Sequence, residues 1–133
     1  MAAASDYLEN KVNDHVWGGG DYVRPATVYV ALFTSAPTDA GGGTEVTGGS
    51  YARAAVTNNT TNFPASAAGA KANAAAISFA TATAAWGTIT HIGVFDALTA
   101  GNLLVHAALS APKTIQNGDT FSLSIGALTV SVS

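Results

Sequence analysis

Short apolar segments of strand length, separated by glycine, proline and asparagine, dominate this sequence of 133 residues. The clearest of them, Thr27 to Thr34, has β-branched and aromatic residues at both odd and even positions. This pattern is typical of a central strand that is covered on both faces. Because helical segments do not alternate with the strands, the order of elements favours an antiparallel arrangement. We therefore predict an all-β fold, a jelly-roll-like antiparallel β-sandwich with one short N-terminal α-helix.

Further strands are expected along the chain. They are predicted at residues 51–57, around Ile77 and Phe79, and at 87–95, 102–109, 113–116 and 120–125. The connection 96–101 is short and contains glycine, so the two strands beside it are predicted to form a hairpin. Asn117-Gly118 predicts a turn. Residues 65–76 are assigned to a loop, because Gly69 and Asn73 interrupt the alanines that favour a helix.

The alternation of apolar residues changes phase near the end of the chain. Phe121, Leu123 and Ile125 occupy odd positions, whereas Leu128 and Val130 occupy even ones. A shift of one residue turns every later side chain to the opposite face of a strand. We predict a bulge or bend at Gly126-Ala127, where the chain could pass from one sheet to another.

The N-terminal segment has the periodicity of a helix. Ser5 is a plausible N-cap, and acidic residues follow in the first turn, where they favour the positive end of a helix dipole. Apolar residues recur at helical spacing from Leu8 until Gly18 to Gly20 end the run. We predict a helix over 5–17 and a β-body over 27–133, within one domain that spans 1–133. A helix this short must dock on the body or on a neighbour, and Trp17 is the candidate anchor.

Charged residues make up 10% of the sequence, against roughly a quarter in an ordinary soluble domain. A surface with so few charged side chains is poorly solvated, which suggests that much of it is covered by copies of the protein or by a larger assembly. The net charge is −3, and the five cationic residues are scattered, so we expect no nucleic-acid partner. No apolar stretch is long enough to cross a membrane, so we expect no membrane partner and synthesis in a cytoplasm.

Residues that could support chemistry are few. Cysteine is absent, which excludes disulfides and thiolate sites. His91 and His106 fall in the predicted hairpin; pairing Phe95 with Leu103 would place them on opposite faces, whereas a register shifted by one would place them on the same face. No third ligand has recognisable spacing, so we expect no metal, no cofactor and no catalytic residue. The alternative from a different class of function is a small hydrolase that uses His91. Trp86 is expected to anchor the core or an interface, with a sugar-stacking platform as the alternative.

Several segments resemble a family of small tailed-bacteriophage structural proteins. They are Ser5 to Lys11, Pro25 to Asp39, Gly48 to Arg53, Trp86 to Ala97 and Gly101 to Leu104, and together they span nearly the whole chain. Members of this family are described as tail fibre proteins, and in some virions they are capsid decoration or cement subunits. The resemblance implies a virion component without enzymatic activity, which is made in the host cytoplasm and assembled in many copies.

The resemblance does not by itself choose between head and tail. A fibre that reaches a host receptor usually needs repeats or a long coiled coil, which this chain lacks. We therefore expect a decoration protein on the capsid surface, with the major capsid protein and further copies of itself as partners. A homotrimer would fit a threefold position of an icosahedral shell. The alternative is an adhesin of the tail tip or tail fibre, in which Trp86 or the 35–49 loop reaches a host glycan.

Contacts with the capsid or with other copies are expected from two regions, the helix and the neutral loop that follows the first long strand. Ordinary packing within one subunit is the alternative role for the helix. The candidate interface residues are Tyr7, Leu8, Val12, Trp17, Thr38, Asp39, Glu45 and Trp86.

Overall fold

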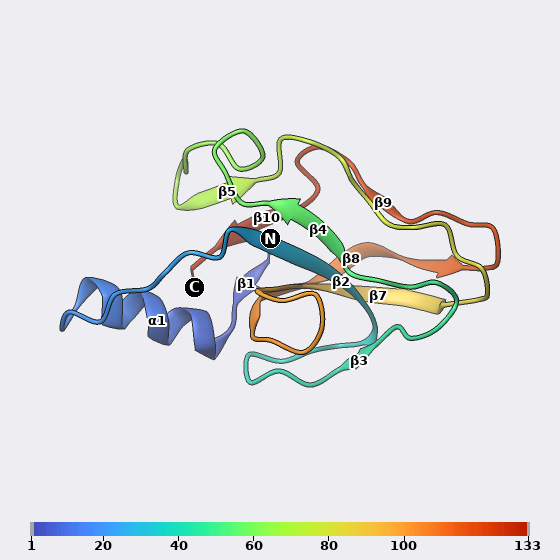
Figure 1. Cartoon of the computed structure of the whole chain (residues 1–133), viewed down its shortest axis with the longest axis horizontal. Coiled ribbons are helices and arrows are strands. Elements are labelled where there is room, and N and C mark those ends of the chain that lie inside the picture. Colours follow the sequence, from blue (N-terminus) through green and yellow to red (C-terminus); the bar gives the residue numbers. More distant parts are fainter. Residues whose placement is uncertain (1, 133) are drawn as a thin grey trace.

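The computed structural model describes residues 2–132 and contains, within them, ten strands and one helix (Figure 1). The structure is mostly β with antiparallel sheets and one short helix, as the sequence predicts. The elements are β1 (Ala3–Ala4), α1 (Asp6–Val16), β2 (Thr27–Ser35), β3 (Thr44–Glu45), β4 (Ala54–Thr57), β5 (Ala70–Ala72), β6 (Ile77–Ser78), β7 (Gly87–Phe95), β8 (Leu103–Ile115), β9 (Ser122–Leu123) and β10 (Thr129–Ser131).

The main sheet contains six strands. Its order is β1, β8, β7, β2 and β3, and β4 also pairs with β2. Strand β2 is central, because it pairs with β7 along one edge and with β4 and then β3 along the other. Val30 and Leu32 lie in the main core, while Ala31 and Phe33 are buried on the opposite face. The prediction that this strand is covered on both sides is therefore confirmed.

A second layer covers one face of the main sheet. It consists of two small antiparallel pairs, β5 with β10 and β6 with β9, and of the loops that join them. Apolar side chains from both layers meet in one buried cluster, to which the second layer contributes Ile77, Phe79, Phe121, Leu123 and Leu128. The arrangement is a sandwich whose second sheet is divided into two short pieces.

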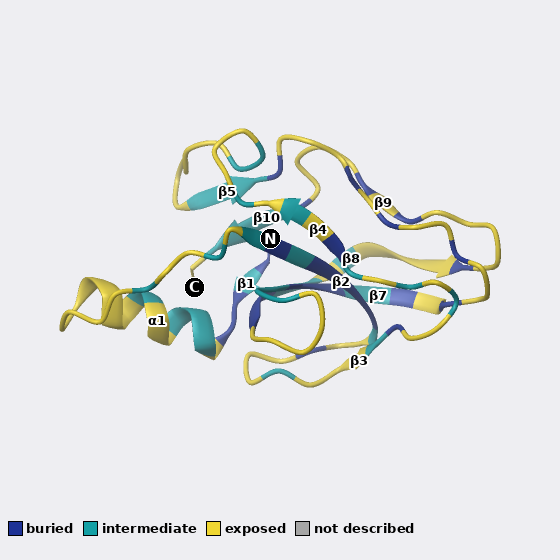
Figure 2. Ribbon diagram, viewed as in Figure 1, coloured by how far each residue is buried: buried dark blue, intermediate teal, exposed yellow. Residues whose placement is uncertain are grey.

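Helix α1 begins and ends where the sequence predicts. Ser5 is the N-cap, and its hydroxyl accepts a hydrogen bond from the N–H of Leu8 at 3.2 Å. No residue of the helix is fully buried, and its second half extends away from the sandwich (Figure 2). The predicted anchor, Trp17, is 75% exposed and does not dock on the body of its own subunit, so docking on a neighbour is the remaining one of the two predicted possibilities.

Residues before the helix belong to the β-structure, which the sequence analysis did not predict. Strand β1 pairs with β8, and the N–H of Ala2 donates to the carbonyl of Thr129 at 2.6 Å. Ala2 and Ala4 are buried. The β-structure is therefore not confined to 27–133, since the first few residues close one edge of the main sheet.

Strand β8 joins two predicted strands into one of thirteen residues. Its register against β7 is irregular between the pairs His91 with Ala108 and Ile89 with Lys113, so four residues of β8 lie opposite one of β7. This irregular stretch contains Pro112, which has no N–H to donate to a neighbouring strand. The strand predicted at 51–57 begins later, at Ala54, and that predicted at 120–125 is reduced to β9.

The hairpin of β7 and β8 settles the orientation of the two histidines. Phe95 pairs with Leu103, but the next pair is Val94 with Val105. Leu104 is therefore an extra residue in β8, and the pairs from Val94 to His91 are shifted by one residue relative to the register that Phe95 and Leu103 would set. His91 therefore pairs with Ala108, and His106 pairs with Gly93. Both histidines lie on the same face, which is the second of the two arrangements that the sequence left open.

The bend predicted at Gly126-Ala127 is confirmed. Gly126 has a φ of 78°, and the N–H of Ala127 donates to the carbonyl of Ser124 in a turn. Before the turn the chain pairs with β6, and after it the chain pairs with β5. The segment 65–76 contains β5 and is not wholly a loop.

Candidate functional site

A cleft of about 480 Å³ lies on the face of the main sheet that the second layer leaves free. It is bounded by the first turn of α1, by the glycine-rich loop after β2, and by the loop between β7 and β8. We call it the loop cleft. The residues that line it are Asp6, Tyr7, Phe33, Asp39 to Gly43, Glu45, Arg53, Phe95 and Ala100 to Leu103.

The floor of the loop cleft is a small apolar cluster. Phe33 and Phe95 stack with ring centroids 6.2 Å apart. Gly93 lies between them and Leu103, and a Cβ at this position would lie 2.9 Å from Leu103 Cδ1 and 3.0 Å from Phe33 Cε1. Because Gly93 has no side chain, Leu103 and Phe33 can pack directly over its backbone.

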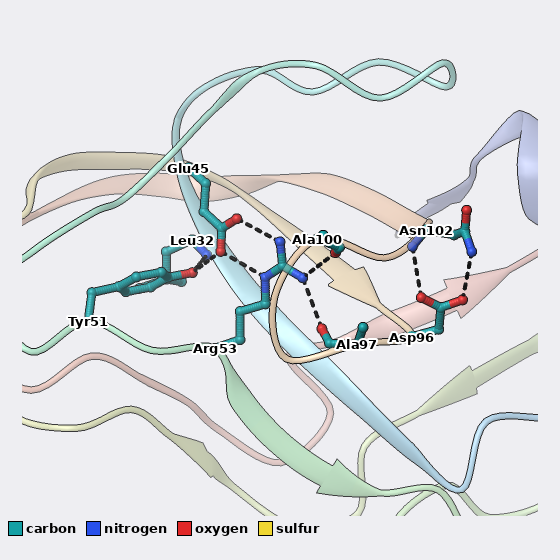
Figure 3. A network of polar contacts seen from close by, with 8 residues as sticks. All are labelled: Leu32, Glu45, Tyr51, Arg53, Asp96, Ala97, Ala100 and Asn102. Carbon is teal, nitrogen blue, oxygen red and sulfur yellow. Dashed lines mark hydrogen bonds and ion pairs between the residues drawn. The ribbon is translucent and has the colours of Figure 1, made fainter.

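Arg53 lies on this floor and contacts β3 and the loop between β7 and β8; Figure 3 shows its polar contacts with Glu45, Ala97 and Ala100. Its guanidinium lies 3.8 Å from the centroid of the Phe95 ring, and it donates to both carboxylate oxygens of Glu45 at 2.8 and 2.9 Å. It also donates to the carbonyls of Ala97 and Ala100 at 2.9 and 2.8 Å. The Arg53 side chain is only 7% exposed. One buried cation thus fixes the position of the loop after β7.

Tyr51 completes the network on the other side of Glu45. Its hydroxyl donates to Glu45 Oε2 at 2.7 Å and accepts from the N–H of Leu32 at 3.0 Å. Burial and the hydrogen bond to Glu45 raise the pKa of Tyr51 far above its usual value. Burial alone would raise the pKa of Glu45, but hydrogen bonds from Arg53 and Tyr51 outweigh it, and the pKa is lowered. Glu45 is therefore an anion at neutral pH.

The wall of the cleft is held by two further contacts. Asp39 Oδ1 lies 2.8 Å from Nε2 of His106 on β8, and the carbonyl of Asp39 accepts from the N–H of Asp6 at 3.0 Å. Across the opening, Asp96 Oδ1 and Oδ2 accept from the backbone and the side chain of Asn102 at 2.7 and 3.0 Å. The cleft thus has fixed walls, and its exposed groups are carboxylates and amides.

Three of the predicted interface residues meet at this cleft. Tyr7, Asp39 and Glu45 all line it, although they come from separate elements. Asp39 contacts His106 but its side chain is 54% exposed, whereas Glu45 is paired with Arg53 and its side chain is 24% exposed. Thr38 is close in sequence but does not line the cleft, and its hydroxyl donates to the carbonyl of Gly41 within the loop at 2.8 Å.

The other predicted residues lie elsewhere. Leu8 lines a separate apolar groove, Val12 is half-buried, and Trp17 is exposed at the end of the helix. Trp86 is 5% exposed and lies in the core, so it is neither an accessible interface residue nor a platform for a sugar. Its indole N–H donates to the carbonyl of Gly49 at 2.9 Å.

The roles of Arg53 and Asn102 were not predicted from the sequence. An arginine near a glutamate gives no distinctive pattern, because the pairing depends on how β3 and β4 lie beside β2. Asp96 and Asn102 flank a glycine-containing turn, and this spacing was the available sign that their side chains would close it. Among the described residues, no three histidine, aspartate or glutamate side chains form a group that could hold a metal ion.

Residues 3–131 match the model of a family described as podophage GP4 fiber I protein gp80. The chain belongs to this family. No curated protein matches the sequence. The match covers α1, the loop cleft and both layers of the sandwich, so membership concerns the whole fold rather than one motif.

Membership of the fiber I protein family identifies a structural component of a phage virion. The description of this family as a fibre protein favours the tail-fibre alternative over the capsid decoration that we expected because the sequence lacks repeats and a long coiled coil. In the described part of this family member, no helix is long and apolar enough to span a membrane.

Proposed function

We propose that the protein is a non-enzymatic component of the phage tail fibre or tail tip that contacts the host surface through the loop cleft. The family of fibre proteins to which it belongs supports this location. The observation that supports a host contact is the loop cleft. Arg53 holds the loop after β7 that bounds this cleft, and the rim of the cleft exposes groups able to bind a polar ligand.

The ligand we propose is an uncharged saccharide. Carboxylates accept hydrogen bonds from hydroxyl groups, and Asp6 and Asp39 present theirs at the cleft. The Tyr7 ring, half-buried at the same cleft, offers an apolar face with a polar end. An anionic sugar would be repelled by the carboxylates of Asp6 and Asp39, because Arg53 is already paired with Glu45 and Lys11, whose Nζ lies 5.6 Å from the centroid of the Tyr7 ring, can offset only one of the two charges.

Location in the virion is tested by immunogold labelling of intact particles. We expect gold at the tail and none on the head. Labelling distributed over the capsid would overturn the proposed location and would restore the decoration role. Because particles without the protein can be labelled in parallel, the experiment has its own negative control.

Host contact is tested by the variant Asp39→Ala. We expect it to reduce adsorption of phage to host cells, and binding of the purified protein to host polysaccharide, by about tenfold, which corresponds to one good charged hydrogen bond. The matched control is Thr38→Ala in the same loop, outside the cleft. Equal adsorption by both variants and the unmodified phage would exclude the cleft as the contact site.

A further inference from the structure

The end of helix α1 carries an exposed apolar surface. Val16 is 56% exposed and Trp17 75%. The N–H of Tyr22 donates to His15 Nδ1 at 3.1 Å, which ties the returning chain to the helix. We call this surface, which also includes Asp14 and Asp21, the helix tip. A group of large apolar side chains so far from the core is typical of an interaction site.

An apolar groove of about 520 Å³ opens beside the base of the same helix. It lies between the main sheet and the pair β5 and β10, and we call it the sheet groove. Its apolar lining comprises Leu8, Val28, Phe63, Val94, Leu104, Val105, Leu128, Val130 and Val132. Its volume is that of a site for several side chains or a small ligand.

The helix tip of a subunit cannot enter the sheet groove of that same subunit. Leu8 lines the groove, and Trp17 follows it by nine residues of rigid helix, or roughly 14 Å at 1.5 Å per residue. The helix leads away from the sandwich (Figure 2). The Trp17 end of the helix is therefore excluded as an occupant of the groove of its own subunit.

Charge identifies the tip of a second copy as a suitable occupant. The sequence has five cationic residues, of which Arg53 is paired with Glu45, yet Arg24 and Lys71 both line the sheet groove. None of the residues that line the groove is acidic. The helix tip instead carries Asp14 and Asp21 beside its apolar residues. Apolar surface and opposite charge thus coincide on the two partners.

We propose that the helix tip of one copy inserts into the sheet groove of a second copy, with Trp17 as the apolar anchor. Asp14 and Asp21 then face Arg24 and Lys71 across the rim. The two surfaces differ, so each copy offers one tip and one groove, and repetition of the contact gives a closed ring or a filament. The expected homotrimer corresponds to a ring of three. This contact goes beyond the proposed host binding and does not depend on it.

Sedimentation of the purified full chain between 1 µM and 1 mM, as orders of magnitude for a weak to moderate contact, tests the proposal. We expect concentration-dependent association, and Trp17→Ser should raise the dissociation constant by about thirtyfold. Lys71→Glu should raise it by about tenfold. The controls are Ile125→Ser, at an apolar residue that is 69% exposed elsewhere, and Lys113→Glu, at a cation outside the groove; both should associate like the unmodified chain.

Mixing the Trp17→Ser and Lys71→Glu variants distinguishes this tip-to-groove contact from a contact in which both copies use the same surface. Trp17→Ser keeps an intact groove and Lys71→Glu keeps an intact tip, so their mixture should form 1:1 pairs in native mass spectrometry. Adding Asp14→Lys to Lys71→Glu should restore association. A monomer at the highest concentration, unchanged association of Trp17→Ser, or failure of the mixture to pair would each overturn the proposal. Immunogold labelling and adsorption are read separately, so these outcomes leave host binding untouched.

Discussion

At the scale of single residues, Tyr51 repairs a gap in the main sheet. Strand β2 pairs with β4 as far as Val30 and with β3 from Phe33, so the N–H of Leu32 has no partner in either strand ladder. The Tyr51 hydroxyl accepts from this N–H and donates to Glu45. A buried N–H without a partner is costly, which explains why a hydroxyl is required at this point.

Replacing Tyr51 with phenylalanine should lower the free energy of unfolding by about 1–3 kcal/mol, the cost of leaving the Leu32 N–H unpaired. The pKa of Tyr51 is raised in the folded state, so its contribution is fully present below the ordinary value of about 10 and is lost as pH rises above it. Urea unfolding at pH 7 and across the alkaline range measures both effects. Tyr29→Phe is the control, and an alkaline loss of stability unchanged by Tyr51→Phe would contradict this assignment.

Arg53→Ala should destabilise the protein by roughly 2–4 kcal/mol, because it leaves Glu45 and two carbonyls without their donor. Arg53→Lys keeps the charge but loses the two-pronged geometry, so its effect should be intermediate. Thermal unfolding at neutral pH gives the comparison. An alanine variant as stable as the parent would show that the network is not structural.

Acid should weaken the same network. The pKa of Glu45 is lowered in the folded state, so its stabilising contribution is complete above the ordinary glutamate value of about 4.3 and is lost as pH falls through the folded value. Glu45→Gln should therefore be less stable than the parent at pH 7 and should lose less stability between pH 5 and 3. Parallel acid dependence of the two proteins, followed by circular dichroism, would contradict this.

At the scale of elements, Ser5 couples the helix to the sheet. Its hydroxyl caps α1, donates to the carbonyl of Leu103, and its N–H donates to the carbonyl of Leu104 at 2.8 Å. Ser5 is 1% exposed. The N-cap that the sequence predicts is thus also the joint between β1, α1 and β8.

Ser5→Ala should cost about 1–3 kcal/mol of stability, since it removes the cap and leaves a buried carbonyl without a donor. It should also speed amide hydrogen exchange in α1 more than in β2, because the helix loses its attachment first. Ser110→Ala, at an exposed residue of β8, is the matched control and should change stability by less than about 0.5 kcal/mol. Equal exchange in parent and variant helices would be evidence against a joint at Ser5.

Elements with strong local patterns were predictable from the sequence, and those made by distant pairing were not. Strands β2 and β7 have long β-branched runs, and α1 has a cap and a glycine stop, so local chemistry specifies them. Strand β5 has the sequence Ala-Lys-Ala and exists because β10 pairs with it. Its neighbour Asn73 is buried, and its side chain accepts from the N–H of Leu128 at 2.9 Å, a contact across 55 residues that no local pattern reveals.

The loop cleft was also only partly predictable from the sequence. The loop after β2 was expected to carry contacts because it is neutral and rich in glycine, and Asp39 does lie in the cleft wall. That Tyr7 and Arg53 reach the same cleft depends on the packing of α1 against β1 and β8, and on the pairing of β4, which follows Arg53, with β2. Trp86 was expected either in the core or at an interface, because an aromatic residue before a glycine does not show which face it occupies; it lies in the core.

At the scale of the whole molecule, the low charge and the projecting helix are related. A surface with few charges relies on partners to cover its apolar parts, and the largest exposed apolar residues include Val16, Trp17 and Val23. The proposed host contact lies at the loop cleft, whereas the proposed contact between copies uses the helix tip and the sheet groove. Assembly and adsorption should therefore be separable by mutation.

Exchanging residues 10–23 for a short glycine-serine linker removes the helix tip and keeps β1, Ser5 and the first turn of α1. The ends to be joined are close, because Leu8 and Arg24 line the same groove. We expect the sandwich to stay folded, with a sharp thermal transition, since no residue of the helix is fully buried.

Self-association of this linker variant should be lost, and its incorporation into virions should fall, because many weak contacts then no longer act together. The Asp39→Ala phage provides the complementary control, with normal incorporation and reduced adsorption. Normal incorporation of the linker variant, measured by quantitative immunoblotting of purified particles, would show that the helix tip has no part in assembly.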